Sequence, residues 1–267
     1  SNHYPFRKKS FDPKRFFGFS PKGYPADFIA EGLDQTRGWF YSLIVLGTAL
    51  FGKSPYKNVI VNGMILASDG QKMSKRLKNY PDPMEVVDKY GADALRFYLL
   101  SSAVVRGEDL RLKEQGIDEV AKKLLMRLDN VRSFYELYCP QEARQKLPEK
   151  GEMNTTPTPF SGTFAAPKHT LDRWVLARLA ELVRDTTAGF EKYELDTAAR
   201  PLGAFIDDLS TWYVRRSRDR FKEDGEDKKQ ALATLRYVLI TVAKVMAPVM
   251  PFFADDLYRR MGGGESV

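Results

Sequence analysis

The sequence has very few of the residues that build disulfide frameworks and zinc sites. Its 267 residues include one cysteine, Cys139, and two histidines, His3 and His169. A lone cysteine excludes an internal disulfide framework and a cysteine-rich zinc site within the chain, so we expect no zinc here. It also favours a reducing, cytoplasmic compartment. Neither histidine belongs to a partner pattern, and we expect both to be exposed and passive.

Long apolar runs and an initial methionine are also missing. The longest apolar run, residues 41–51, is interrupted by serine, glycine and threonine and is too short to span a bilayer, so we expect no membrane partner. The first residues, Ser-Asn-His-Tyr-Pro-Phe, have neither the cationic nor the apolar segment of a signal peptide. We therefore expect the chain to be a piece of a longer protein.

The overall composition is typical of a globular protein. Hydrophobic residues make up 43% of the sequence and charged residues 29%. A chain of this length suggests about two domains. The formal net charge is +7, from 42 basic and 35 acidic residues. This mild excess fits a solubilising surface as well as a polyanion partner such as RNA, and charge alone does not separate the two interpretations.

The first third of the chain has the pattern of a strand, a helix and a second strand. Residues 27–32 are a short apolar stretch that predicts a buried strand, residues 36–51 repeat apolar side chains at helical spacing, and residues 57–67 are β-branched and apolar. In such a unit the strands are parallel and ligands bind beyond their carboxyl ends. The polar segments 31–37 and 68–79 begin there, which makes them the candidate binding segments.

The remainder of the chain is predicted to be helical. The apolar periodicity predicts helices at residues 83–90, 92–101, 118–138, 171–193, 195–221 and 227–246, and a short last helix through Arg260. Residues 139–168 instead collect Pro, Gly, Thr and Glu with little periodicity, which predicts a linker and a domain boundary. The long helices after this linker predict a helical bundle.

The loop after the second predicted strand carries the clearest chemical signal, with the sequence DGQKMSKR at residues 69–76. Aspartate and glycine favour a tight turn. Lys72 and Lys75 bring two ammonium groups to the sheet edge where nucleotide phosphates bind. A lysine in that place can stabilise the charge that develops during nucleotidyl transfer. An exposed basic turn without a chemical role is the alternative, and the lysine content alone leaves it open.

Residues 72–76, Lys-Met-Ser-Lys-Arg, resemble the Lys-Met-Ser-Lys-Ser signature of class I aminoacyl-tRNA synthetases, with Arg76 in place of the last serine. Four further segments are similar to the isoleucyl branch of that family: residues 26–40, 62–64, 77–83 and 207–218. The first contains Asp-Gln-Thr-Arg-Gly-Trp, an order that the patterns of the valyl and leucyl relatives lack. The resemblance covers nearly the whole chain and is weakest in the predicted linker.

The resemblance implies an α/β region followed by an all-α region. The first is the C-terminal half of a Rossmann-like nucleotide-binding fold, and the second ends in an anticodon-binding helical bundle. The implied parts are a catalytic half-domain, connecting helices, a linker and the bundle, at residues 1–100, 101–140, 141–168 and 169–267. The sequence lacks the family's His-x-Gly-His motif and its editing domain. We therefore expect this chain alone to be inactive, with a sheet edge exposed where the other half belongs.

The resemblance further implies that the parent protein activates isoleucine with ATP and Mg²⁺ to isoleucyl-AMP and then esterifies tRNA(Ile). Lys72 and Lys75 are implied to be catalytic and to close over ATP, with Lys75 as the main transition-state contact. Trp39 is implied to pack against the isoleucine side chain. The residues implied to bind ATP or the adenylate are Glu31, Gly32, Asp34, Gln35, Asn62, Gly63, Met64, Met73 and Ser74. Those implied to contact the tRNA backbone are Arg215, Arg216 and Arg218.

Each of these roles has a structural alternative. The polar residues after the first strand could cap the next helix, and Trp39 could be ordinary core. The arginine run, which continues to Arg220 and Lys222, could be a solvated helix end where cations favour the dipole. The functional alternatives are a stand-alone tRNA-binding module without catalysis, a helical scaffold protein with a degenerate nucleotide fold, and valine or leucine as the substrate.

Overall fold

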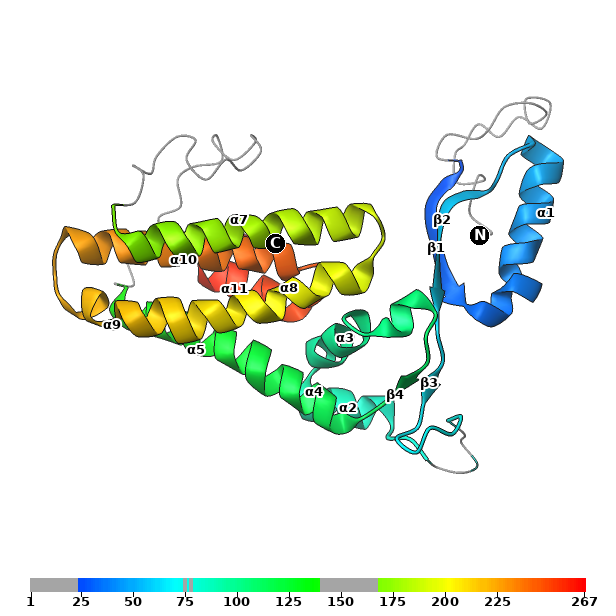
Figure 1. Ribbon diagram of the computed structural model, residues 1–267, viewed down its shortest axis with the longest axis horizontal. Coiled ribbons are helices and arrows are strands. Elements are labelled where there is room, and N and C mark those ends of the chain that lie inside the picture. The colour runs from blue at the N-terminus through cyan, green and yellow to red at the C-terminus, as the bar shows by residue number, and fades with distance from the viewer. Residues whose placement is uncertain (1–23, 74–75, 77–78, 140–167) are drawn as a thin grey trace. The chain divides into compact units, whose positions relative to one another are not determined.

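The computed structural model describes residues 24–73, 76, 79–139 and 168–267 (Figure 1). The chain divides into two compact units. The first unit consists of residues up to Ile65 together with Ala103–Leu110, and the second of Leu66–Ser102 and Arg111–Val267. Most of the linker predicted at residues 141–168 lies outside the described residues. No helix in the described part of the chain is both long enough and apolar enough to cross a membrane.

The first unit contains the predicted strand–helix–strand arrangement. Strand β1 (Ala26–Gly32) pairs in parallel with β2 (Tyr56–Asn62), with Gly32 opposite Asn62. The 3-10 helix η2 (Leu33–Arg37) and the helix α1 (Trp39–Phe51) connect them. Helix α1 ends where Gly52 takes a left-handed conformation with a φ of 63° and donates its N–H to the Thr48 carbonyl. The parallel βαβ unit is therefore confirmed.

Two expectations for these strands are corrected. Strand β1 was expected to be buried, but Ile29 is its only buried residue. The reason is that one α-helix, two short 3-10 helices and a two-stranded sheet, among the described residues of this unit, offer too little surface to cover both faces of a strand. The second strand was expected to run over residues 57–67, but β2 ends at Asn62 and a separate strand, β3 (Ile65–Leu66), follows.

The break between β2 and β3 comes from backbone partners far along the sequence. The Gly63 N–H donates to the Val104 carbonyl at 2.8 Å, and the Met64 N–H donates to the Asp109 carboxylate at 3.0 Å. A Cβ atom at position 63 would lie 2.0 Å from the Glu108 carbonyl oxygen, so only glycine fits. Strand β3 then pairs with β4 (Leu110–Arg111), which was not predicted.

The second unit contains the predicted helices of residues 83–138, but the last of them begins at Glu114 rather than at residue 118. Helix α2 (Pro83–Tyr90) has proline in its first turn, and the Asp82 carboxylate accepts the Met84 N–H at 2.8 Å as its N-cap. Helix α3 (Ala92–Leu100) follows directly. A longer helix is continuous through α4 (Glu114–Val120), the π-helical segment η4 (Ala121–Met126) and α5 (Arg127–Tyr138).

The rest of this unit is the predicted helical bundle (Figure 1). Its elements are α7 (Thr170–Glu191), α8 (Leu195–Asp207), the π-helical segment η5 (Asp208–Val214), α9 (Arg215–Lys222), α10 (Glu226–Met246) and α11 (Pro251–Arg260). The core side chains follow the apolar stripes of the sequence. Leu202, Leu209 and Leu239 are among those with no exposed surface. A core this complete is the main source of stability in such a bundle.

Helix α3 is attached to the end of the bundle by two charged side chains. The buried Asp93 carboxylate accepts the Phe253 N–H at 2.6 Å, which satisfies a free donor in the first turn of α11. The Arg96 guanidinium donates to the Val249 and Pro248 carbonyls at 3.0 and 3.2 Å. The segment that follows the lysine loop is thus held to the bundle within one compact unit.

Candidate functional site

The predicted adenylate residues of the first unit gather at one edge of its sheet. Because β1 and β2 are parallel and Gly32 pairs with Asn62, both strands end at this edge. Glu31 and Asp34 are exposed there. A Cβ atom on Gly32 would lie 2.7 Å from an oxygen of the Asp34 carboxylate, so this carboxylate folds back over the glycine. The edge therefore presents two carboxylates on a tight turn.

Gln35 has a structural task at this edge. Its side-chain carbonyl accepts the Trp39 N–H at 2.9 Å, and its amide donates to the Asp34 carboxylate at 2.9 Å. The first contact satisfies a free N–H at the start of α1, which is the capping alternative considered above. The second holds the Asp34 side chain. Gln35 thus links the start of the helix to the exposed carboxylate.

Trp39 is not part of the hydrophobic core. Its side chain is 38% exposed, whereas the neighbouring Phe40 is 5% exposed and fills the buried position. The two rings lie 6.1 Å apart between centroids. Of the two interpretations, ordinary core is therefore wrong for Trp39, which presents an aromatic surface at the start of α1.

The backbone around Gly63 is largely occupied. The N–H groups of Gly63 and Met64 are bonded to Val104 and Asp109, as described above, and the Met64 carbonyl accepts the Leu110 N–H at 2.9 Å. A ligand at this position would therefore have to use other groups, such as the Gly63 carbonyl or the exposed Met64 side chain.

In the second unit, Lys72 lies on a hairpin. Leu66 and Lys72 form an antiparallel bridge, and the Ala67 N–H donates to the Gln71 carbonyl at 2.9 Å. The tight turn expected at Asp69 and Gly70 is confirmed: Gly70 has a φ of 84°, and the Asp69 carboxylate accepts the Gln71 N–H. The Lys72 side chain is exposed. Ser74 and Lys75 lie outside the described residues.

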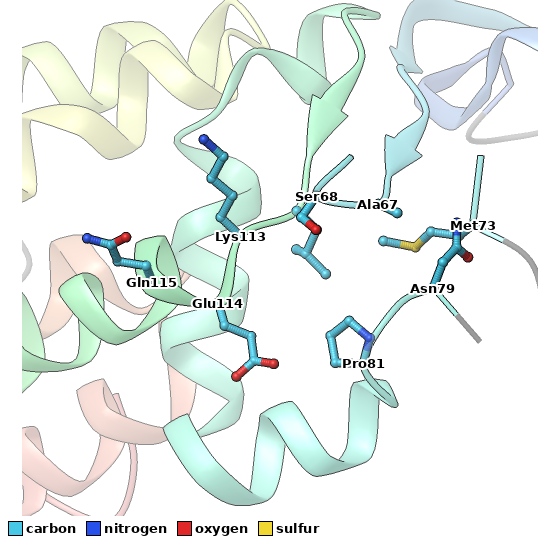
Figure 2. A pocket seen from close by; sticks show the side chains of 9 residues that line it. Ala67, Ser68, Met73, Asn79, Pro81, Lys113, Glu114 and Gln115 are labelled. Atoms are coloured by element: carbon cyan, nitrogen blue, oxygen red, sulfur yellow. The ribbon is translucent and has the colours of Figure 1, made fainter. Parts of the chain in front are cut away.

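A cavity of about 380 Å³ lies beside this hairpin, within the second unit (Figure 2). Figure 2 shows Met73 and Asn79 on one side of it and Lys113, Glu114 and Gln115 on the other. The Asn79 amide donates to the Lys72 carbonyl at 3.2 Å, so the cavity wall is bonded to the hairpin.

Two hydrogen bonds hold the Glu114 side chain beside this cavity. Its carboxylate accepts from the Lys89 ammonium at 3.1 Å and from the Tyr90 hydroxyl at 3.2 Å. These two hydrogen bonds, with the nearby positive charge, hold the pKa of Glu114 below its usual value. The carboxylate therefore stays ionised at neutral pH, where it serves as an anchor between α2 and α4.

The arginine run of the bundle divides into two groups. Arg215, Arg216 and Arg218 are exposed, and in the described part of the chain they form no ion pair. Arg220 instead donates to both oxygens of the buried Asp172 carboxylate at 2.8 Å and also to Asp227. Arg220 is therefore a structural residue.

The helix-dipole alternative fits only part of this run. Arg220 and Lys222 are the basic residues in the last turn of α9, whereas the three exposed arginines precede that turn. Because the effect of the dipole falls off within the last turn, it does not account for the exposed group.

His169 is also structural. Its Nδ1 atom accepts the Leu171 N–H at 3.2 Å and caps the start of α7. The expectation that this histidine is exposed and passive is therefore wrong, and His3 lies outside the described residues. In the described part of the chain, no three His, Cys, Asp or Glu side chains come together in a way that could hold a metal ion.

Two family models match the chain. The model described as tRNA synthetases class I (I, L, M and V) matches residues 11–112, and the one described as anticodon-binding domain of tRNA ligase matches residues 172–267. The isoleucine–tRNA ligase of Chlamydia muridarum is 46% identical over 262 residues, which cover 97% of this chain. The chain belongs to the class I aminoacyl-tRNA synthetases.

The chain spans about a quarter of the length of these synthetase relatives. It covers 23% of the Chlamydia muridarum protein. It also covers 23% of the isoleucine–tRNA ligase of Chlamydia trachomatis serovar D, which is 45% identical over 271 residues.

Solved synthetase structures share the fold. Mycobacterium tuberculosis methionyl-tRNA synthetase in complex with methionyl-adenylate matches with a TM-score of 0.65 at 21% identity, over 88% of this chain and 44% of that one. The Agrobacterium radiobacter K84 LeuRS–tRNA–LeuAMS complex matches with a TM-score of 0.62 at 18% identity, over 89% and 28%. The predicted succession of an α/β region and a helical bundle is thus confirmed.

Both groups of predicted site residues fall inside the regions matched by the synthetase models. The sheet-edge residues and the lysine signature lie within residues 11–112, and the three exposed arginines lie within residues 172–267. The sequence analysis missed the wall of the cavity formed by residues 112–115 and the capping role of His169. The only sequence signal for residues 112–115 is the polar start of α4. It does not reveal that Met73, some forty residues earlier in the chain, lies across the cavity from them.

Proposed function

We propose that the protein to which this chain belongs is an isoleucine–tRNA ligase. It would activate isoleucine with ATP to isoleucyl-AMP and pyrophosphate, and then transfer the isoleucyl group to tRNA(Ile). The observation that carries this proposal is the 46% identity to an isoleucine–tRNA ligase over 97% of the chain. The described residues offer places for all three substrates.

The sheet edge of the first unit suits the amino acid and its adenylate. Exposed carboxylates such as Glu31 and Asp34 bind an α-ammonium group or ribose hydroxyls through charge-assisted hydrogen bonds. We assign Gln35 to holding Asp34 and the start of α1, because both ends of its amide are engaged. Gly32 leaves room for Asp34. Trp39 would supply the apolar wall for the isoleucine side chain, since its ring is partly exposed.

For the adenine base we propose contacts with the chain at Asn62, Gly63 and Met64. The two N–H groups of Gly63 and Met64 are occupied, so the Gly63 carbonyl is the better candidate to accept from the adenine amino group. Met73 and Ser74 of the lysine signature are proposed to contribute further contacts to the nucleotide.

We assign the polyphosphate of ATP to the lysine hairpin. Lys72 and Lys75 would neutralise the charge that develops on the phosphates during adenylate formation, with Lys75 as the main contact. Mg²⁺ would accompany ATP through its phosphate oxygens. The described residues offer no cluster of ligands for it or for zinc, so we assign no protein ligand to a metal.

We assign the tRNA backbone to the exposed arginines of α9. Arg215, Arg216 and Arg218 are free to bind phosphates because, in the described part of the chain, no carboxylate neutralises them. Such contacts release counterions, so tRNA binding is expected to weaken steeply as salt increases.

A pyrophosphate-exchange assay tests the amino-acid assignment. It should use the longest polypeptide that the reading frame encodes, with isoleucine, valine and leucine supplied separately. We expect exchange to be fastest with isoleucine. Faster exchange with valine or leucine would contradict the assignment and point to that relative instead.

A second candidate function is a stand-alone tRNA-binding module without catalysis. The three exposed arginines of α9 and the anticodon-binding domain model that matches residues 172–267 support it. The two candidates differ in one measurement. The module predicts salt-dependent tRNA binding with no isoleucine-dependent exchange from the longest polypeptide, whereas the ligase predicts both.

A further inference from the structure

A short segment from later in the chain holds the turn that follows β2. It consists of the 3-10 helix η3 (Ala103–Arg106) and residues 107–109, and it belongs to the first unit. Gly107 has a φ of 85°, a conformation that glycine adopts without strain. The Glu108 N–H donates back to the Ala103 carbonyl at 3.3 Å, which closes the segment into a compact turn. This 103–109 turn has a defined conformation of its own, so it can act as a fixed support.

The 103–109 turn binds both peptide groups that flank Gly63. The N–H of the first group, that of Gly63 itself, donates to the Val104 carbonyl at 2.8 Å. The N–H of the second group, that of Met64, donates to the Asp109 carboxylate at 3.0 Å. A glycine without such partners has more backbone freedom than any other residue. The two hydrogen bonds therefore remove the freedom that Gly63 would otherwise have.

The hydrogen bond to Asp109 also determines where the Gly63 carbonyl points. This carbonyl and the Met64 N–H belong to the same peptide group, which is planar and trans, so they point in opposite directions. Because the Asp109 carboxylate holds the N–H on one side, the carbonyl is directed to the other side. A carboxylate also polarises the peptide group that donates to it, which makes the carbonyl a stronger acceptor. The adenine contact proposed above uses this carbonyl.

We propose that Asp109 is a positioning residue for the adenine base. Through the Met64 N–H, it orients the Gly63 carbonyl toward the adenine amino group, without touching the nucleotide itself. This inference rests on the proposed adenine contact and adds to it the residue that fixes its direction. If Asp109 only stabilised the fold, its loss would affect every nucleotide equally. A positioning role instead predicts an effect that is confined to a base with an amino group.

The test compares two nucleotides in the longest polypeptide that the reading frame encodes. ATP carries the adenine amino group, whereas purine riboside triphosphate lacks only that group. Isoleucine-dependent pyrophosphate exchange gives KM and kcat for each nucleotide. The KM of the wild type is expected to be roughly 2- to 10-fold lower for ATP, the range for one neutral hydrogen bond.

Three variants separate positioning from charge and from folding. Asp109→Ala should lose most of the preference for ATP, while the KM for isoleucine stays unchanged. Asp109→Asn removes the charge but keeps an oxygen that can accept the Met64 N–H, so it should retain the preference. Glu108→Ala removes a neighbouring exposed carboxylate and is the matched control, which should behave like the wild type. Unchanged thermal unfolding shows that each variant is folded.

The outcomes separate the positioning role from the proposals on which it rests. If Asp109→Ala keeps the preference, or if Asp109→Asn loses it as well, the positioning role is wrong and the adenine contact stands. If the wild type does not distinguish the two nucleotides, the adenine contact at Gly63 is wrong, and the positioning role falls with it. If neither nucleotide supports isoleucine-dependent exchange, the ligase proposal itself is wrong, together with both.

Discussion

The helical bundle and the β1–α1–β2 unit differ in how they place their hydrophobic side chains. In the bundle, large residues such as Leu209, Leu235 and Phe221 have no exposed surface. In the βαβ unit, Tyr41 and Leu46 on α1 are 63% and 57% exposed. Exposed apolar surface on this scale is unusual for a self-contained domain. The bundle therefore buries its own hydrophobic side chains, whereas the described residues of the βαβ unit leave large hydrophobic side chains of α1 exposed.

The ion pairs differ in the same way. In the bundle, the Asp172 side chain is fully buried and accepts from Arg220 and Tyr213. In the βαβ unit, Asp27 and Lys57 pair at 2.7 Å with 74% and 57% of their side chains exposed. A surface pair contributes little because water already solvates both charges, whereas the loss of one buried partner leaves an uncompensated charge.

The largest expected effect comes from the buried pair. Asp172→Asn should destabilise the bundle by about 3–5 kcal/mol, because Arg220 loses the carboxylate that receives both of its N–H groups. Asp27→Asn, at the exposed pair, should change stability by less than about 1 kcal/mol. Urea denaturation followed by circular dichroism measures both. Equal effects at the two positions would remove the contrast between the regions.

Truncation of hydrophobic side chains should also destabilise the bundle more than the βαβ unit. Leu209→Ala removes a fully buried side chain and should cost about 2–5 kcal/mol, from lost burial and the cavity that remains. Leu46→Ala, at a side chain that is 57% exposed, should be nearly neutral for folding. A clear loss of stability from Leu46→Ala would show that the Leu46 side chain is buried in solution, which would contradict the contrast between the two regions.

The adenylation rate should depend on a residue whose substitution leaves the stability of the bundle unchanged. In the longest encoded polypeptide, Lys75→Ala should slow adenylation roughly 10²- to 10³-fold through lost transition-state stabilisation, while bundle unfolding stays the same. Lys57→Ala, at an exposed surface pair, is the control and should retain the rate. Single-turnover formation of isoleucyl-AMP is the measurement. An unchanged rate for Lys75→Ala would refute its assigned role.

The smallest expected effect is on the melting temperature at acidic pH. Hydrogen bonds from Arg220 lower the pKa of Asp227 below its usual value. Its contribution to stability is therefore present above the unfolded pKa and is lost as the pH falls through the lower folded value. The melting temperature should decrease between about pH 5 and about pH 2, and Asp227→Asn should show a shallower decrease. Parallel curves for the two proteins would mean that this carboxylate is not linked to folding.

The sequence predicts those parts of the fold that depend on local pattern. The bundle helices repeat apolar residues at helical spacing, and Pro83 and Gly91 mark the ends of α2, so these elements lie where expected. The parallel pairing of β1 and β2 follows from the βαβ order. In each case the signal lies within one element, so no knowledge of distant contacts is needed.

The parts that were missed depend on distant partners. The break after Asn62 is set by hydrogen bonds to residues 104 and 109, and β4 exists only because β3 is beside it. In the arginine run, Arg220 differs from Arg218 because Asp172 and Asp227, which lie on other helices, accept hydrogen bonds from it. The capping task of Gln35 was one of two interpretations that the pattern left open.

The π-helical segment Asp208–Val214 fixes the angular phase of the helix after it. A π-helical turn contains about one residue more than an α-helical turn, and each α-helical residue turns the chain by about 100°. The wider turn therefore absorbs one additional residue while the helix on either side keeps its angular phase. Arg215 and Arg216 face the exterior and Phe221 stays in the core. Deletion of one residue within the π-helical segment would restore α-helical geometry and leave these directions unchanged, whereas deletion of one residue within α9 would rotate the residues after it by about 100°.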